Sequence, residues 1–190
     1  MSETKTTRFY WLRWLVFSAV MVALSTALSY VKVWQMPLGG AVTLLSMVPI
    51  CTVGLMYGPV KALPACFVYS VIQMLQGGAF GWGLTPTVLI VCLLFDYIVP
   101  FTGMALAGLC YKGKAPLPLV GVIAALVFRF ACHFLTGVTI WSSLEVYGNP
   151  WIYSLVYNGT YMLPELLFTL GAFALLFYTK VFDQMKRILF

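Results

Sequence analysis

The sequence predicts an all-α fold: an integral membrane bundle of six transmembrane helices with both termini in the cytoplasm. Of its residues, 62% are hydrophobic and only 8% are charged, whereas a soluble domain carries about 25% charged residues. The apolar runs are long and continuous, which favours helices over a membrane β-barrel, whose strands alternate. The basic residues gather in connections that would share one side of the membrane.

Six apolar segments fill the 190 residues, so we expect a single membrane domain over residues 1–190. The predicted helices are 14–31, 42–57, 62–76, 85–110, 117–141 and 152–178. Breaks rich in Gly, Pro or Lys separate them at 37–40, 58–59, 77–78, 112–114 and 148–150. No small-residue cleavage site follows the first segment, so we interpret it as a retained helix rather than a signal peptide.

The basic residues set the predicted orientation. With the N-terminus in the cytoplasm, nine fall on the cytoplasmic side: Lys5, Arg8, Arg13, Lys61, Lys112, Lys114, Lys180, Lys186 and Arg187. Only Lys32 falls outside, which is a strong positive-inside pattern. The net charge of +6 then reflects topology and contact with the anionic lipid bilayer, so no nucleic-acid partner is expected.

Five polar groups lie inside three of the predicted helices: Asp96, Arg129, His133, Asn158 and Glu165. Arg129 and His133 continue into Gly137 and Trp141 at intervals of four, so these residues share one helix face. Asn158 and Glu165 share a face as well, with Tyr161 between them. Glu165 follows Pro164 and could either relieve the broken backbone bonding there or pair with Arg129. Because charged groups in a membrane are costly and usually mark a ligand site, we expect a pocket that reaches from the outer face to mid-membrane.

The chemistry of these residues favours binding over catalysis. Carboxylates beside aromatic rings suit a cation, and Arg, His, Asn and Tyr suit a polar heterocycle. An intramembrane enzyme that uses Asp96, His133 and Glu165 is an alternative, but the sequence contains no HExxH, GxSxG or P-loop motif. The five cysteines form no CxxC pair, so neither a metal site nor a cofactor is expected.

A family resemblance narrows the function. The stretches LFDYIVPFTGMALAGL (94–109), RFACHFLTGVTIW (129–141), YSLVYNGTYMLPEL (153–166) and WQMPLGGAVTLLSMVPI (34–50) resemble the ThiT/YuaJ family. Its members are thiamine-specific S components of energy-coupling factor (ECF) transporters. The resemblance implies a six-helix, non-enzymatic subunit of the bacterial plasma membrane that captures thiamine from outside. It also implies a partner module of one transmembrane coupling protein and two ATPases, which alone use ATP.

The resemblance also implies a binding site. By position it consists of Trp34, Asp96, Tyr97, Arg129, His133, Gly137, Trp141, Tyr153 and Asn158, with Tyr161 and Glu165 as possible additions. Within it, His133 and Trp141 would stack on the thiazolium, and Arg129 would hold Asp96 ionised. Asp96, Asn158 and Tyr153 would contact the aminopyrimidine.

Three positions differ from the residues known in the ThiT/YuaJ family. Asp96 and Arg129 stand where Glu and Lys are known, and Glu165 has no acidic counterpart there. A modified thiamine-like ligand or another heterocyclic vitamin therefore stays open. A stand-alone carrier is a further alternative, although no inverted repeat is visible.

The first helix carries a stripe of small residues, Ala19, Ala23 and Ala27. Such a stripe permits close helix approach and suits either packing inside the bundle or, as the resemblance implies, docking of the coupling protein.

Overall fold

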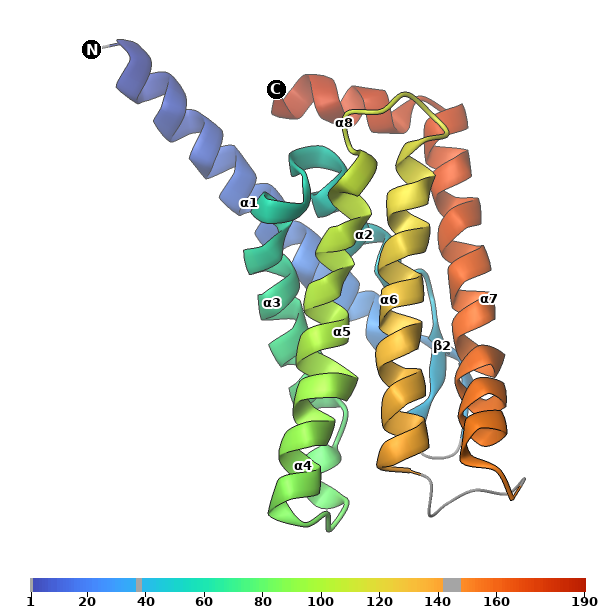
Figure 1. The fold of residues 1–190 in the computed structure, drawn as a ribbon. Helices are drawn as coiled ribbons and strands as arrows, with labels where there is room; N and C mark the ends of the chain where they lie inside the picture. The colour runs from blue at the N-terminus through green and yellow to red at the C-terminus, as the bar shows by residue number, and fades with distance from the viewer. Residues whose placement is uncertain (1, 37–38, 142–147) are drawn as a thin grey trace.

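The computed structural model describes residues 2–36, 39–141 and 148–190, and within them a bundle of long helices (Figure 1). The elements in order are α1 (Ser2–Tyr30), β1 (Lys32–Gln35), β2 (Ala41–Thr43), α2 (Met47–Tyr57), α3 (Pro59–Gln76), η2 (Ala79–Gly81), α4 (Pro86–Cys92), η3 (Leu93–Ile98), α5 (Val99–Thr102), η4 (Gly103–Cys110), α6 (Pro118–Thr139), α7 (Pro150–Tyr178) and α8 (Val181–Leu189). Residues 37–38, the first half of the predicted break 37–40, lie outside the described residues.

Five helical stretches are long and apolar enough to cross a membrane: Phe9–Tyr30, Pro59–Gly81, Pro86–Cys110, Pro118–Thr139 and Pro150–Tyr178. The second predicted helix, 42–57, is different. Within it only Met47–Tyr57 is helical, and the 11 residues of α2 span roughly 16 Å, about half of a bilayer core. Nearly every residue of α2 is buried, so this short helix lies inside the bundle.

The prediction of an all-α fold was wrong in one place. Residues 32–35 and 41–43 form a two-stranded antiparallel hairpin, in which Trp34 pairs with Val42 and Lys32 with Thr43. The strands are rich in Val and Thr, which favour extended backbone. Strand β2 has only three residues and runs directly into the apolar segment that follows it. The hydrophobic pattern therefore placed its last two residues in the predicted helix 42–57.

The fourth predicted helix, 85–110, is also not a regular α-helix. It passes from α4 through one π-helical stretch, η3, into α5 and then the 3₁₀-helix η4. Pro100 lacks the N–H that would bond the Asp96 carbonyl in a regular α-helix, which accounts for the wider turn. The irregular stretch carries Asp96 and Tyr97.

Small residues let the central elements approach closely. A Cβ built on Gly54 of α2 would lie 2.8 Å from the Gly108 nitrogen, and one on Gly108 would lie 2.7 Å from the Gly54 carbonyl oxygen. On α6, a Cβ at Gly121 would clash with the Ala107 carbonyl of η4. These glycines bring α2, η4 and α6 into backbone contact, a packing mode typical of membrane helices.

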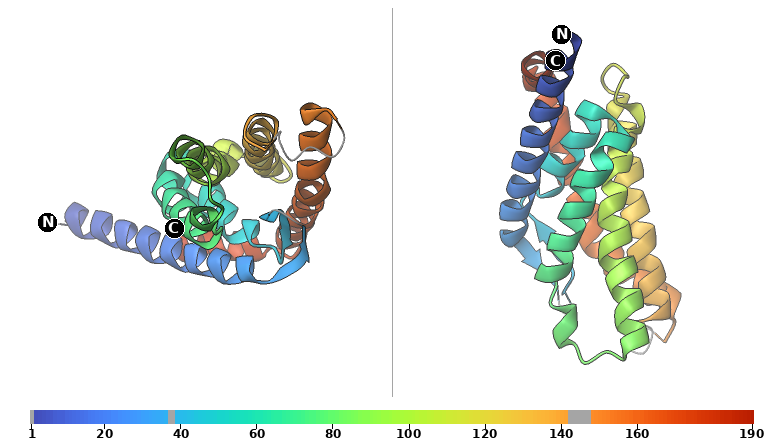
Figure 2. Two further views of the ribbon diagram at one scale, coloured as in Figure 1. Left: turned by 90° about the horizontal axis from the view of Figure 1, so that it is seen from below. Right: turned by 90° about the vertical axis from the view of Figure 1, so that its left-hand side faces the viewer.

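The start of α1, the connection between η4 and α6, and α8 all lie at the same end of the bundle (Figures 1 and 2). Helix α8, which the sequence analysis did not predict, crosses this end with Phe182 buried beneath it. Phe190, which directly follows α8, contacts the rings of Tyr10 and Tyr57, with ring centroids 6.2 and 5.3 Å away. Basic residues such as Lys61 and Lys186 also belong to elements that meet here.

The small-residue stripe of α1 lies on the outer surface. Ala19, Ala23 and Ala27 are all exposed, whereas the inward face is formed by Ser18, Val22, Ser25 and Ser29. Packing inside the bundle therefore does not explain the three alanines.

We predict that Gly121→Ala destabilises the protein by about 2 kcal/mol, because the new methyl group must displace η4 from α6. Thermal unfolding in detergent measures this change. Gly171→Ala in α7 is the matched control, since nothing lies within 4 Å of its new Cβ, and its melting temperature should be unchanged or slightly higher. Equal melting temperatures for the two variants would contradict the proposed contact.

Candidate functional site

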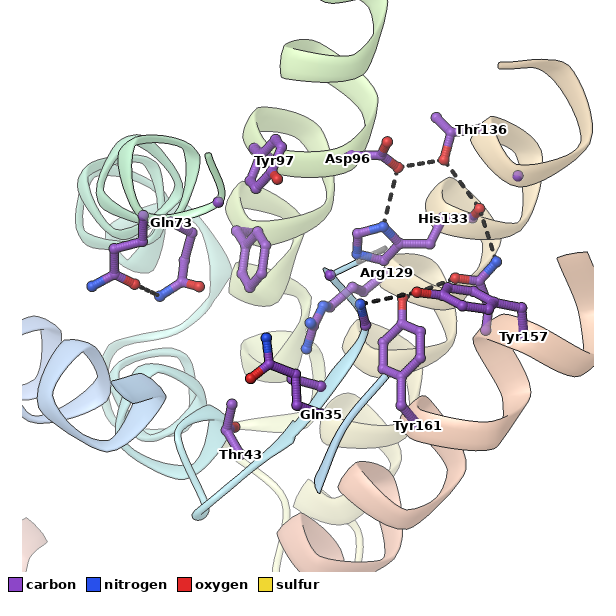
Figure 3. A pocket seen from close by; sticks show the side chains of 18 of the residues that line it. Gln35, Thr43, Gln73, Asp96, Tyr97, Arg129, His133, Thr136, Tyr157 and Tyr161 are labelled. Carbon is purple, nitrogen blue, oxygen red and sulfur yellow. Dashed lines mark hydrogen bonds and ion pairs between the residues drawn. The ribbon is translucent and has the colours of Figure 1, made fainter. Parts of the chain in front are cut away.

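A cavity of about 500 Å³ (Figure 3) lies in the part of the bundle away from α8 (Figure 1). It is formed where the end of α1, the hairpin, the end of α3 and η3 meet the end of α6 and the start of α7. Residues that line it include Ser29, Lys32, Gln73, Gln76, Trp82, Asp96, Tyr97, Phe101, Arg129, His133, Thr136, Gly137, Trp141, Tyr153, Tyr157, Asn158 and Tyr161. Most of the predicted site residues thus line a single cavity.

The Asp96 carboxylate is held by side chains of α6 and the residue stretch that follows it. His133 Nδ1 lies 3.2 Å from Asp96 Oδ1, and the Thr136 hydroxyl donates to the same oxygen. Trp141 Nε1 donates to Oδ2 at 3.2 Å. His133 and Thr136 share one face of α6, which turns toward η3, and Trp141 lies two residues beyond the end of the helix. The result is a carboxylate held in place at the wall of the cavity.

Gly137 and Asn158 join α6 to α7 beside this carboxylate. Asn158 Nδ2 donates to the His133 carbonyl oxygen at 3.2 Å, and Asn158 Oδ1 accepts from the Tyr161 hydroxyl at 2.8 Å. A side chain at Gly137 would clash with Ser154, so only glycine permits this approach of the two helices. Asn158 therefore positions Tyr161 and the backbone of His133 together.

The expected pairing of Asp96 with Arg129 is not what the structure shows. Arg129 Nη1 lies 3.8 Å from Glu165 Oε2 on α7, and its guanidinium carbon lies 4.5 Å above the Phe101 ring. Arg129 and His133 are one turn apart, so the histidine, nearer the end of α6, meets Asp96, while the arginine, one turn earlier, meets Glu165. The sequence placed Arg129 and His133 on one face of α6, but it did not show which neighbouring element each side chain meets.

Glu165 lies outside the cavity lining, only 2% exposed. Its Oε1 accepts a hydrogen bond from Thr43 Oγ1 of β2 at 2.8 Å. Glu165 therefore balances the charge of Arg129 and ties the hairpin to α7. The Gly40 N–H makes a second tie by donating to the Tyr157 hydroxyl at 3.0 Å.

Aromatic rings form much of the remaining wall. Trp141 packs edge-on against Trp82, with ring centroids 5.4 Å apart, and Tyr97 lies so close to Gly77 that a side chain there would clash. Tyr153 stacks on Tyr157 at 5.7 Å. Trp34, in contrast, is 50% exposed on β1 and does not line the cavity. A binding role for Trp34 stays a prediction.

Several lining residues were absent from the sequence-based site. Thr136 follows His133 by three positions and so shares its helix face, a pattern that could have identified it. Trp82, Tyr157 and the polar trio Ser29, Gln73 and Gln76 lie on elements whose packing the sequence did not reveal.

Comparison with known proteins identifies the family. Residues 15–183 match the model of the thiamine transporter protein family (Thia_YuaJ). The chain belongs to this family. It is 31% identical over 181 residues to the thiamine transporter ThiT of Bacillus subtilis, covering 87% of this chain and 90% of that protein. It is 27% identical over 160 residues to ThiT of Lacticaseibacillus paracasei, covering 75% of each.

A solved ThiT structure from Listeria monocytogenes shares the fold of this family member, with a TM-score of 0.72 and 22% identity. The match covers 90% of this chain and 97% of that one. Family membership and the five long apolar helices make the chain a multi-pass protein of the bacterial cell membrane. The relatives are named as transporters, a non-enzymatic function, so the enzyme alternative is not supported.

We predict that Glu165→Ala destabilises the protein by about 3 kcal/mol, because it leaves the buried Arg129 guanidinium without its carboxylate. Unfolding in detergent measures the loss. Glu165→Gln should lose less, since its amide oxygen still accepts from Thr43. Replacing both partners, Arg129→Met with Glu165→Leu, should recover part of the loss. Simple addition of the two single effects would show that the residues do not interact.

Proposed function

We propose that this chain is the substrate-binding S component of an ECF-type transporter, which captures thiamine from the extracellular side. The observation that carries the proposal is the Asp96 carboxylate, held by α6 in a cavity walled by tryptophan and tyrosine rings, in a chain of the thiamine transporter family. Thiamine combines a cationic thiazolium with an aminopyrimidine, and a carboxylate beside aromatic faces suits both.

The hydrogen bonds around Asp96 suggest how the ligand is received. Trp141 Nε1 occupies an oxygen of Asp96 that the ligand's amino group would otherwise use. On binding, that amino group would take over the oxygen, and the indole would be released to stack on the thiazolium. Tyr153 and Asn158 also line the cavity, and they would contact the pyrimidine edge.

The proposed orientation follows from charge. The cavity lies at one end of the bundle, and α8 with its Lys186 and Arg187 lies at the other. If the basic end faces the cytoplasm, both termini are cytoplasmic and the cavity opens outward. Thiamine would then enter without crossing the bilayer.

Delivery into the cell requires partners. We propose that the exposed alanine stripe of α1 is the surface on which the transmembrane coupling protein docks, with ATP hydrolysed only by the two partner ATPases. In this proposal the chain itself uses no cofactor.

The first test is a titration of the purified protein with thiamine, monitored by tryptophan fluorescence. We expect saturable quenching at one thiamine per chain, because Trp82 and Trp141 lie at the cavity. Riboflavin and biotin serve as controls. Quenching by one of them, without a response to thiamine, would assign the site to another vitamin.

Variants locate the site. Asp96→Asn and Trp141→Ala should each weaken thiamine binding at least about 10-fold, since each removes a group that meets the ligand's positive charge. Trp151→Ala is the matched control, because that indole is 56% exposed and lies outside the cavity lining. Full affinity in both cavity variants would refute the assignment.

The docking surface is tested separately. Ala23→Leu should abolish thiamine uptake by vesicles that contain the complete transporter, while thiamine binding stays unchanged. Val20→Leu, on the exposed side of the same helix, should leave uptake near normal. Uptake by Ala23→Leu at the normal rate would remove the stripe from the interface.

A further inference from the structure

Three polar side chains form a linked cluster on the side of the cavity away from Asp96. Ser29 Oγ of α1 donates to Gln76 Oε1 of α3 at 3.1 Å, and Gln73 Nε2 donates to Gln76 Oε1 at 3.0 Å and to Ser29 Oγ at 3.2 Å. All three residues line the cavity. Figure 3 shows Gln73 on one side, Asp96 on the other, and Tyr97 between them in this view.

The cluster is not internally complete. Gln76 Nε2 is buried and has no hydrogen-bond partner within the described parts of the chain, and Gln73 Oε1 accepts none of the hydrogen bonds found there. A buried amide group without a partner costs roughly 1–3 kcal/mol. The cluster therefore offers one donor and one acceptor, the combination that a single hydroxyl group satisfies.

The cluster is neutral, whereas the opposite side of the cavity carries Asp96. Gly77 follows Gln76 directly and packs against Tyr97, the neighbour of Asp96, and both sides line the same cavity of about 500 Å³. A small elongated ligand can therefore reach both.

We propose that Ser29, Gln73 and Gln76 form a second subsite, which binds a neutral hydroxyl group on the side arm of the ligand whose cationic part lies at Asp96. The inference rests on the proposed function and deepens it: for thiamine, the group is the terminal hydroxyl of the hydroxyethyl arm. Gln76 Nε2 donates to that hydroxyl oxygen, and the hydroxyl hydrogen is donated to Gln73 Oε1. Ser29 holds both amides in position from α1.

The experiment is calorimetric titration with two ligands, thiamine and an analogue that carries an ethyl group in place of the hydroxyethyl arm. The unmodified protein should bind the analogue about 10-fold more weakly than thiamine, because the amides are left unpaired. Gln76→Met and Gln73→Met should each weaken thiamine binding by a similar factor. Both variants should bind the analogue as tightly as the unmodified protein does, so that discrimination is lost.

The control is Thr102→Val, which removes a hydrogen bond between α5 and α3, Thr102 Oγ1 to Ser70 Oγ at 3.3 Å, outside the cavity lining. This variant should keep full discrimination. Equal affinities of the unmodified protein for both ligands would overturn the subsite while leaving thiamine binding established. Discrimination that persists in both glutamine variants would do the same. Failure to bind either ligand would instead overturn the proposed function.

Discussion

Charge balance inside a lipid-surrounded bundle is the constraint on which the rest of this structure depends. An isolated charge within a membrane is costly, so each ionised group here is met by another group of the chain. Asp96 is surrounded by donors from one face of α6, and Arg129 is met by Glu165 from α7. The first arrangement leaves the Asp96 carboxylate available at the cavity wall. In the second, Glu165 balances the positive charge of Arg129, which lines a cavity proposed to bind a cation.

The second arrangement also explains why a hairpin can form part of a cavity wall in a helical protein. Glu165 accepts from Thr43, and Tyr157 accepts from the Gly40 backbone, so the two strands are tied to α7 at separate points. A two-stranded hairpin has little stability of its own. Its position is therefore set by side chains of a helix, and the same glutamate serves both the charge balance and the hairpin.

Much of the site was predictable because helical spacing is visible in the sequence. Arg129, His133 and Gly137 lie on α6 and Trp141 just beyond its end, and all four line one cavity with Asp96 and Asn158, as expected. The sequence left open whether Arg129 pairs with Asp96 or with Glu165, since spacing along α6 does not say which neighbour lies at which depth. Gln73 and Gln76 were missed for a related reason: a polar residue near a helix end is ordinary until packing shows what it faces.

The π-helical stretch from Leu93 to Ile98 has a further consequence for how this chain can vary. One residue added to an α-helix rotates everything beyond it by about 100°, which would turn inward-facing residues toward lipid. The wider turn here absorbs such a residue locally, so that Cys92 before it and Phe101 after it both remain buried. The stretch thus sets which residues of α5 and η4 face inward. Loss of one residue there would leave α4 in place and rotate α5 and η4 away from α6.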